Sequence, residues 1–111
     1  MTDPIPLFHL DDIEDGGSAS FVAVLQEKRT GLLVVRQGAA VVVYVNSCPH
    51  IGAPLDFEPG RFLNAEKDLI LCSTHGALFR IEDGHCVHGP CIGGHLEPVA
   101  VRVEGGRVFL A

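Results

Sequence analysis

The feature that most limits the fold is a series of short, largely β-branched apolar segments separated by turn signals. Segments of this length and composition are typical of β-strands, and turns such as Gly105-Gly106 between them favour antiparallel pairing. The pattern predicts an all-β fold, an antiparallel barrel or sandwich. The expected strands are 21–24, 31–36, 41–45, 69–71, 78–81, 99–103 and 108–110. A short helical turn is expected within the acidic stretch 11–17, where glycines would end it.

The length of 111 residues predicts a single domain, 1–111. The longest uninterrupted apolar run, Ala39 to Val45, has 7 residues, far fewer than the roughly 20 that span a bilayer. No basic segment precedes an apolar one near Met1, so no signal peptide is expected. We therefore expect a soluble, cytoplasmic protein. The formal net charge of -6 argues against nucleic acid and against the anionic surface of a membrane as partners.

Two short motifs lie at the ends of the long proline-containing stretch 47–68. A loop of that length in a compact domain is usually functional. The first motif is Cys48-Pro49-His50 and the second is Cys72-Ser73-Thr74-His75-Gly76, with 21 residues between them. Each motif offers one thiol and one imidazole, so the two loops could close over a metal site from opposite sides. The candidate ligands are Cys48, His50, Cys72 and His75.

These four residues admit three interpretations. A mononuclear zinc site would accept the ligand set, although zinc knuckles usually pair two cysteines in one loop and two histidines in the other. A 2Fe-2S cluster with two cysteines on one iron and two histidines on the other fits the mixed motifs. In the third interpretation the residues are unrelated and bind no metal. Small residues beside the motifs would allow close backbone approach and expose N–H groups to bridging sulfides; they are Gly52, Ala53, Gly76 and Ala77.

The sequence resembles the Rieske proteins, and within them the small soluble Rieske-type ferredoxins. The segments that carry the resemblance are 48–55 (CPHIGAPL), 72–79 (CSTHGALF) and 83–90 (DGHCVHGP). It implies a Rieske-type β fold in which residues of about 46–95 form a small cluster-binding subdomain from two loops. It also implies one 2Fe-2S cluster per chain, with Cys48 and Cys72 on one iron and His50 and His75 on the other. Pro90 would belong to the loop that covers the cluster.

The same resemblance implies a one-electron carrier rather than an enzyme. Such ferredoxins take an electron from an NAD(P)H-dependent flavoprotein reductase and deliver it to a ring-hydroxylating oxygenase, or to another redox enzyme. Two alternatives remain at this point. One is a Rieske-type small subunit of a larger reductase, such as nitrite reductase, and the other is a structural zinc module.

The resemblance also bears on the reduction potential. Two neutral imidazoles in place of thiolates leave the oxidised cluster uncharged, which places Rieske centres at about -150 to +300 mV. High-potential members carry an extra disulfide and hydroxyl donors to the cluster sulfurs. The corresponding positions here are Ala53 and Thr74 for the disulfide, and Ala77 and Phe79 for the hydroxyls. We therefore expect a potential near the low end, around -150 mV.

Two further cysteines, Cys86 and Cys91, lie in a stretch with His85, His88 and His95. They could form a disulfide or a second metal site. Alternatively, Cys86 is a small apolar residue at a strand position and Cys91 packs beside the cluster, with the histidines on an exposed loop. We expect packing, because a reducing cytoplasm disfavours the disulfide.

Overall fold

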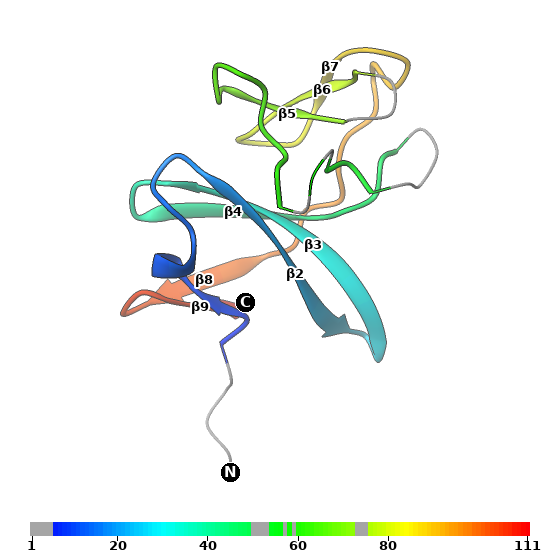
Figure 1. Ribbon diagram of the computed structural model, residues 1–111. Helices are drawn as coiled ribbons and strands as arrows, with labels where there is room; N and C mark the ends of the chain where they lie inside the picture. Colours follow the sequence, from blue (N-terminus) through cyan, green and yellow to red (C-terminus); the bar gives the residue numbers. More distant parts are fainter. Residues whose placement is uncertain (1–5, 50–53, 57, 59, 73–75) are drawn as a thin grey trace.

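The computed structural model describes residues 6–49, 54–56, 58, 60–72 and 76–111. Their regular structure is almost entirely antiparallel β (Figure 1). The strands are β1 (Phe8–His9), β2 (Ser18–Leu25), β3 (Lys28–Gln37), β4 (Ala40–Val45), β5 (Leu69–Leu71), β6 (Leu78–Arg80), β7 (Cys86–His88), β8 (Val101–Glu104) and β9 (Arg107–Leu110). One 3-10 turn, η1 (Leu10–Asp12), follows β1. The predicted all-β fold is confirmed.

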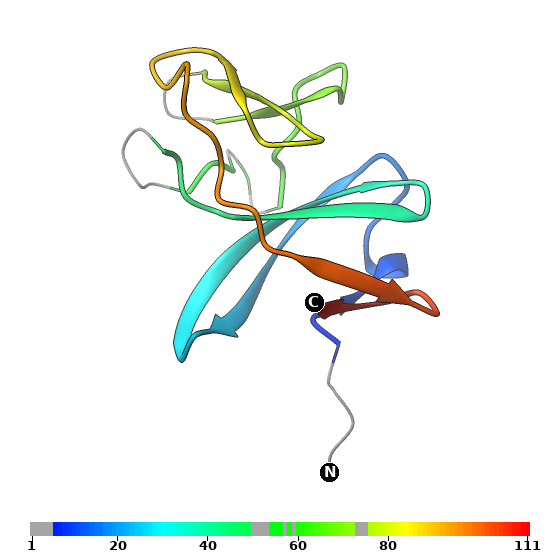
Figure 2. The ribbon, with the colours of Figure 1, turned by 180° about the vertical axis from the view of Figure 1, so that it is seen from behind.

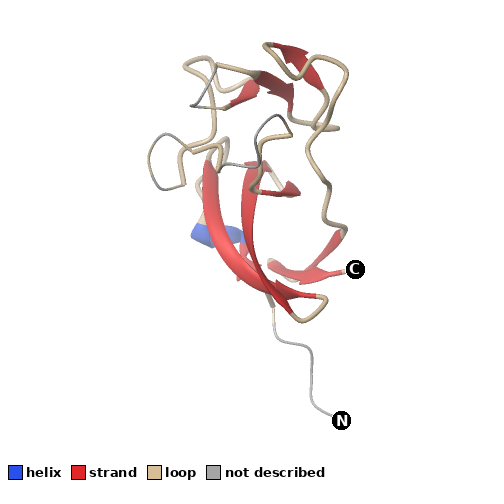
Figure 3. Ribbon diagram, turned by 90° about the vertical axis from the view of Figure 1, so that its right-hand side faces the viewer, coloured by secondary structure: helices blue, strands red, loops and turns tan. Residues whose placement is uncertain are grey.

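The strands that the structure describes form three three-stranded sheets, with strand orders β2-β3-β4, β1-β9-β8 and β5-β6-β7. The β2-β3-β4 sheet lies between the other two (Figures 1 and 2). In these views β1, β8 and β9 lie below β4, and the β5-β6-β7 sheet lies above it. Figure 3 shows the same stacking from the side. The two cysteines of the candidate motifs, Cys48 and Cys72, pack in the core beneath that upper sheet.

Strand β3 is buried on both faces. Leu32 and Val34 pack into a core with Phe8 and other residues of the lower part, while Leu33 and Val35 pack into a core with residues of the upper sheet. A strand with a core on either side requires a continuous apolar run instead of polar–apolar alternation. The run Leu32–Val35 therefore holds the two parts of the molecule together.

Two tight turns set the register of the hairpins. At the β8–β9 turn, Gly105 and Gly106 have φ angles of 58° and 79°, and at the β2–β3 turn Gln26 and Glu27 have φ angles of 49° and 65°. Two-residue turns with both residues in the left-handed region match the twist of the strands that they join. The glycine pair was recognisable in the sequence. The Gln–Glu pair was not, so the strands on either side of it are longer than predicted.

The upper sheet is joined to β4 through Tyr44. The Tyr44 hydroxyl donates a hydrogen bond of 2.7 Å to the carbonyl oxygen of Ile81. Gly84, with a φ of 71°, lies against the ring, and a Cβ at this position would be 2.8 Å from the ring atom Cε1 of Tyr44. The turn between β6 and β7 is thus also the place where the upper sheet rests on β4.

The seven predicted strands correspond to β2–β6, β8 and β9, with ends that differ by up to three residues. Strands β1 and β7 were missed, because two or three residues carry too little pattern to be recognised. The helical turn begins at Leu10 and ends at Asp12, ahead of the glycines. Within the described part of the chain, no helix is long and apolar enough to cross a membrane.

Candidate metal centre

Cys48 and Cys72 are both buried in the upper core. Cys48 lies three residues after the end of β4, and Cys72 directly follows β5. Their exposed fractions are 2% and 0%, and they belong to one apolar cluster with Leu55, Phe62 and Phe79. A thiolate in such surroundings needs a compensating cation, and the thiolate is the form that binds soft metals. The donor type and burial of these two residues fit an iron–sulfur centre.

Asn46 ties together the two ends of the first cysteine loop. Its Oδ1 accepts a hydrogen bond of 2.8 Å from the backbone N–H of Leu55, and its Nδ2 donates one of 3.2 Å to Asp56. Asp56 also accepts a 3.2 Å hydrogen bond from the N–H of Gly60. Leu55, nine residues after Asn46, is therefore held next to the end of β4, and the loop that contains Cys48 is closed. Sequence reasoning missed Asn46 and Asp56, since nothing in their local spacing marks this contact.

The second cysteine loop is closed by backbone hydrogen bonds. The N–H of Cys72 donates to the carbonyl of Ala77 at 2.8 Å, and the N–H of Gly76 donates to the carbonyl of Cys72 at 3.0 Å. Gly76 has a φ of 68° and open space where a Cβ would stand. A left-handed backbone conformation of this kind favours glycine, and the close approach to a cluster expected at this position stays a prediction.

Ala77, also expected to allow close backbone approach, lies against another segment of the chain. A Cβ on Gly89 would lie 2.8 Å from the Cα of Ala77. Gly94, in the same segment, has Pro49 beside it, with its Cβ position 3.7 Å from that of Pro49. The segment 89–94 therefore packs against both cysteine loops. Pro90 lies in this segment and is exposed; its role in covering a cluster remains a prediction.

His50 and His75 lie outside the described residues, as do Gly52, Ala53 and Thr74. Among the residues that are described, no group of three or more His, Cys, Asp or Glu side chains could hold a metal ion. All members of the second candidate cluster are described: His85, Cys86, His88, Cys91 and His95. Within the described part of the chain, these five residues are not brought together as a metal-binding group.

Cys86 and Cys91 are in contact. Their sulfur atoms are 2.8 Å apart, and the exposed fractions of the residues are 1% and 8%. Burial, followed by the hydrogen bond to Cys86 and the charges of Cys86 and Cys48, raises the pKa of the Cys91 thiol to about 12. Both side chains pack in the upper core as expected, and both are thiols.

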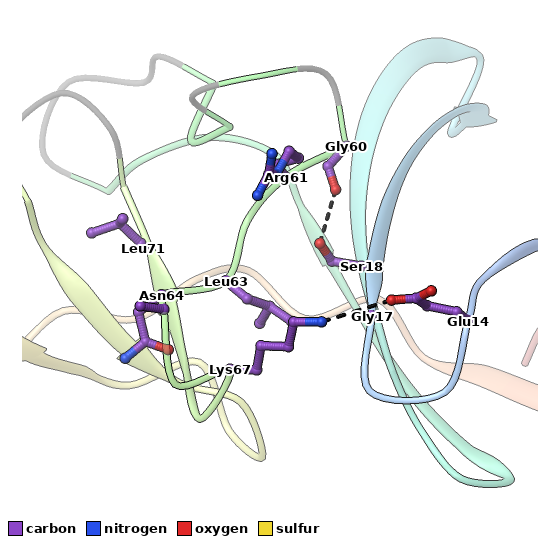
Figure 4. A pocket seen from close by; sticks show the side chains of 10 residues that line it. Glu14, Gly17, Ser18, Gly60, Arg61, Leu63, Asn64, Lys67 and Leu71 are labelled. Atoms are coloured by element: carbon purple, nitrogen blue, oxygen red, sulfur yellow. Dashed lines mark hydrogen bonds and ion pairs between the residues drawn. The ribbon is translucent and has the colours of Figure 1, made fainter.

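The segment that leads from the first loop to β5 is attached to the start of β2. The Ser18 hydroxyl donates to the carbonyl of Gly60 at 2.8 Å and accepts from the N–H of Phe62 at 3.2 Å. Beside it is an open hollow of about 560 Å³, across which Lys67 pairs with Glu14 at 3.7 Å (Figure 4). Neither Cys48 nor Cys72 lines this hollow. The residues around it attach the segment before β5 to β2 and are not candidate metal ligands.

The chain matches the family model of the Rieske [2Fe-2S] domain over residues 3–103, and it belongs to that family. The family identifies the cofactor as one 2Fe-2S cluster, which decides against the zinc interpretation. No curated protein matches the chain significantly.

Solved structures with similar folds include two ferredoxins, one of which is named as the ferredoxin of a dioxygenase. The ferredoxin of carbazole 1,9a-dioxygenase from Nocardioides aromaticivorans IC177 is 25% identical over 99% of this chain and 98% of its own, with a TM-score of 0.74. The Sphingomonas yanoikuyae B1 ferredoxin is 26% identical over 97% of both chains, with a TM-score of 0.70. A protein described as the small subunit of a nitrite reductase (NADPH) is 17% identical over 99% of this chain and all of its own, with a TM-score of 0.67. That last similarity supports the shared fold alone.

Proposed function

We propose that this protein is a one-electron carrier that passes electrons from an NAD(P)H-dependent flavoprotein reductase to a ring-hydroxylating oxygenase in the cytoplasm. The observation that carries the proposal is the pair of buried cysteines, Cys48 and Cys72, at the ends of β4 and β5 in one core. The name of the Nocardioides relative, a ferredoxin of a dioxygenase, supports an oxygenase as the acceptor. In this proposal residues 1–111 form one domain and the catalysis belongs to the partner proteins.

The proposed ligands are Cys48 and Cys72 on one iron and His50 and His75 on the other. When bound, the cluster takes up and releases one electron at a time. Cys48 and Cys72 would supply the two thiolates, and the apolar side chains of Leu55, Phe62 and Phe79 around them exclude water. The hydrogen bonds of Asn46 would keep the first ligand loop in place.

The same neighbours support a low reduction potential. Ala77 and Phe79 are buried beside Cys72 in the upper core, and neither carries a hydroxyl that could donate to a cluster sulfur. Fewer donors stabilise the more negative reduced state less.

The carrier is better supported than a nitrite reductase subunit. The two ferredoxins reach 25% and 26% identity, while the nitrite reductase protein reaches 17%. All four proposed ligands are also present in the sequence.

The decisive experiment compares the purified protein with two histidine variants. The wild type should contain two irons and two sulfides per chain and show visible absorption that dithionite bleaches. His50→Ala should lose this absorption, whereas His9→Ala, at an exposed position next to η1, should keep it. Electron flow from NADPH through a flavoprotein reductase to an oxygenase should then require the wild-type cluster. A colourless wild type with one zinc per chain would contradict the proposal.

A further inference from the structure

Cys86 and Cys91 face each other inside the upper part of the molecule. Cys86 is in β7, where it pairs with Phe79 of β6, and its backbone N–H donates to the carbonyl of Gly94 at 3.0 Å. Cys91 follows Pro90, and its sulfur is 2.8 Å from that of Cys86. The Cys86 thiol also lies 3.3 Å from the carbonyl oxygen of His88, to which it donates. Backbone pairing therefore holds one member of the pair, and the turn at 89–92 presents the other to it.

The distance between the sulfur atoms distinguishes a covalent bond from a shared metal. Two thiolates on one tetrahedral zinc, each at about 2.3 Å, lie about 3.8 Å from each other. A disulfide holds its sulfurs at about 2.05 Å. The observed 2.8 Å is closer to the disulfide, and the described residues offer no third ligand. A movement of less than about 1 Å would bring the sulfurs to bonding distance.

We propose that Cys86 and Cys91 are a reversible modification site, at which an intramolecular disulfide forms when the surrounding thiol–disulfide poise becomes oxidising. The oxidant is a low-molecular-mass disulfide, such as glutathione disulfide. This pairing is distinct from the extra disulfide that high-potential Rieske proteins carry between their cluster loops, since Cys86 and Cys91 lie in neither loop.

The reaction balances as two successive exchanges. One cysteine sulfur attacks glutathione disulfide, whose S–S bond breaks, and one glutathione leaves with the proton of that thiol. The second cysteine then displaces the second glutathione, which takes the other proton. Two protein S–H bonds and one glutathione S–S bond are replaced by one protein S–S bond and two glutathione thiols. Two electrons pass from the cysteine pair to glutathione.

The position of the pair gives the disulfide a consequence for the metal centre. The bond would close a ring over residues 86–91, which overlaps the segment 89–94. That segment packs against Ala77 through Gly89 and against Pro49 through Gly94. Oxidation would therefore restrain the segment that contacts both cysteine loops. Only this consequence depends on the proposed function, because the thiol chemistry of the pair is the same with or without a cluster.

Burial sets the rate of the exchange. Both thiols are nearly inaccessible, and the raised pKa of Cys91 leaves little of the reactive thiolate at neutral pH. The exchange must wait for the segment to open, so the experiment has to run to equilibrium.

Tryptic peptides allow a direct test, because cleavage after arginine and lysine separates the cysteines. Residues 81–102 form one peptide that contains Cys86 and Cys91, while Cys48 falls in peptide 37–61 and Cys72 in peptide 68–80. The cluster-containing protein is equilibrated in glutathione buffers of increasing oxidised fraction and quenched with acid. It is then alkylated and digested with trypsin, and the peptide masses are measured by mass spectrometry. Peptide 81–102 should accept two alkyl groups in reducing buffer. In oxidising buffer it should accept none and weigh two hydrogen atoms less.

The matched variants are Cys86→Ser and Cys91→Ser, each of which leaves a single thiol in the peptide. Neither should produce the lighter, unalkylated peptide at any glutathione ratio. The proposal would be overturned if peptide 81–102 of the wild type kept two alkylatable thiols at every glutathione ratio. So would a stable glutathione adduct in place of the internal bond, or a disulfide to peptide 37–61 or 68–80. Metal analysis of the same samples tests the proposed function separately.

Discussion

The hydrogen bond from Tyr44 to Ile81 should carry a measurable part of the stability of this fold. Tyr44→Phe removes only the hydroxyl and keeps the ring that packs against Gly84. The carbonyl oxygen of Ile81, a residue that is 2% exposed, then loses its 2.7 Å donor. Leaving a buried acceptor without its partner costs about 1–3 kcal/mol. With a urea m-value of about 2 kcal/mol per molar, the denaturation midpoint should fall by roughly 0.5–1.5 M.

The pH dependence of this difference provides the sharper test. Burial, with the negative charges of Asp83 and Glu82, raises the pKa of Tyr44 from 10.0 to about 12. A group whose pKa is raised in the folded state contributes its full stabilisation below the unfolded pKa and loses it as the pH rises through the folded pKa. The contribution is therefore present below pH 10 and lost between pH 10 and 12. The two pKa units set an upper limit of about 3 kcal/mol on this loss.

The assay is urea denaturation of wild type and Tyr44→Phe, followed by circular dichroism at matched cluster content. The wild type should be more stable at pH 7, and its advantage should shrink steadily above pH 10, because only the wild type has this hydroxyl to ionise. Effects of pH on other groups are common to both proteins and cancel in the difference. A loss below about 0.5 kcal/mol at pH 7, the size of an ordinary surface substitution, would refute the reasoning. A difference that is unchanged at pH 11.5 would refute it as well.

Two further predictions concern single substitutions, and a third concerns the reduction potential. Gly84→Ala should destabilise the protein more than Gly38→Ala. Both positions have a positive φ, which costs about 1–2 kcal/mol for a residue with a Cβ. Only a Cβ at position 84 would also press on the Tyr44 ring. Thermal denaturation checks the order, and equal losses would contradict it. Asn46→Ala should speed the loss of iron to a chelator severalfold. The control is Asn64→Ala, which removes similar backbone hydrogen bonds near β5 and should leave the rate close to that of the wild type. If the two variants lost iron at the same rate, the Asn46 contact would not support the ligand loop. Protein-film voltammetry should find a midpoint near -150 mV, and a value well above zero would show that the missing hydroxyl donors do not set it.

The sequence predicted the parts of the fold whose signal is local. The apolar run Leu32–Val35 and the turn Gly105–Gly106 are recognisable because strand composition and left-handed glycines act on neighbouring residues. Strand β7 was missed, since three residues that pair with β6 owe their conformation to that partner and not to their own pattern. The turn at Gln26–Glu27 was also missed, because its conformation depends on the pairing of β2 with β3 and not on a pattern in these two residues.

The residues of the candidate site also differ in whether the sequence alone could reveal them. Cys48 and Cys72 could be proposed as ligands because metal chemistry restricts which residue types can serve, and the structure buries both in one core; their role as ligands stays a prediction. Asn46 could not be found, since its contact with Leu55 depends on how the loop returns to β4, and asparagine is common in loops for many reasons. A contact between Cys86 and Cys91 was considered from the sequence, but the distance between their sulfur atoms depends on the fold around them.

The shared strand β3 also links the metal centre to the far end of the molecule. Because Leu32 and Val34 face one core while Leu33 and Val35 face the other, the backbone of this strand cannot open without disturbing both. Its amide hydrogens should therefore be among the slowest in the chain to exchange with solvent. Binding of the cluster, which stabilises only the folded state, should slow their exchange even on the face turned away from the cysteines. Loading with iron would then strengthen the lower sheets, although no ligand comes from them.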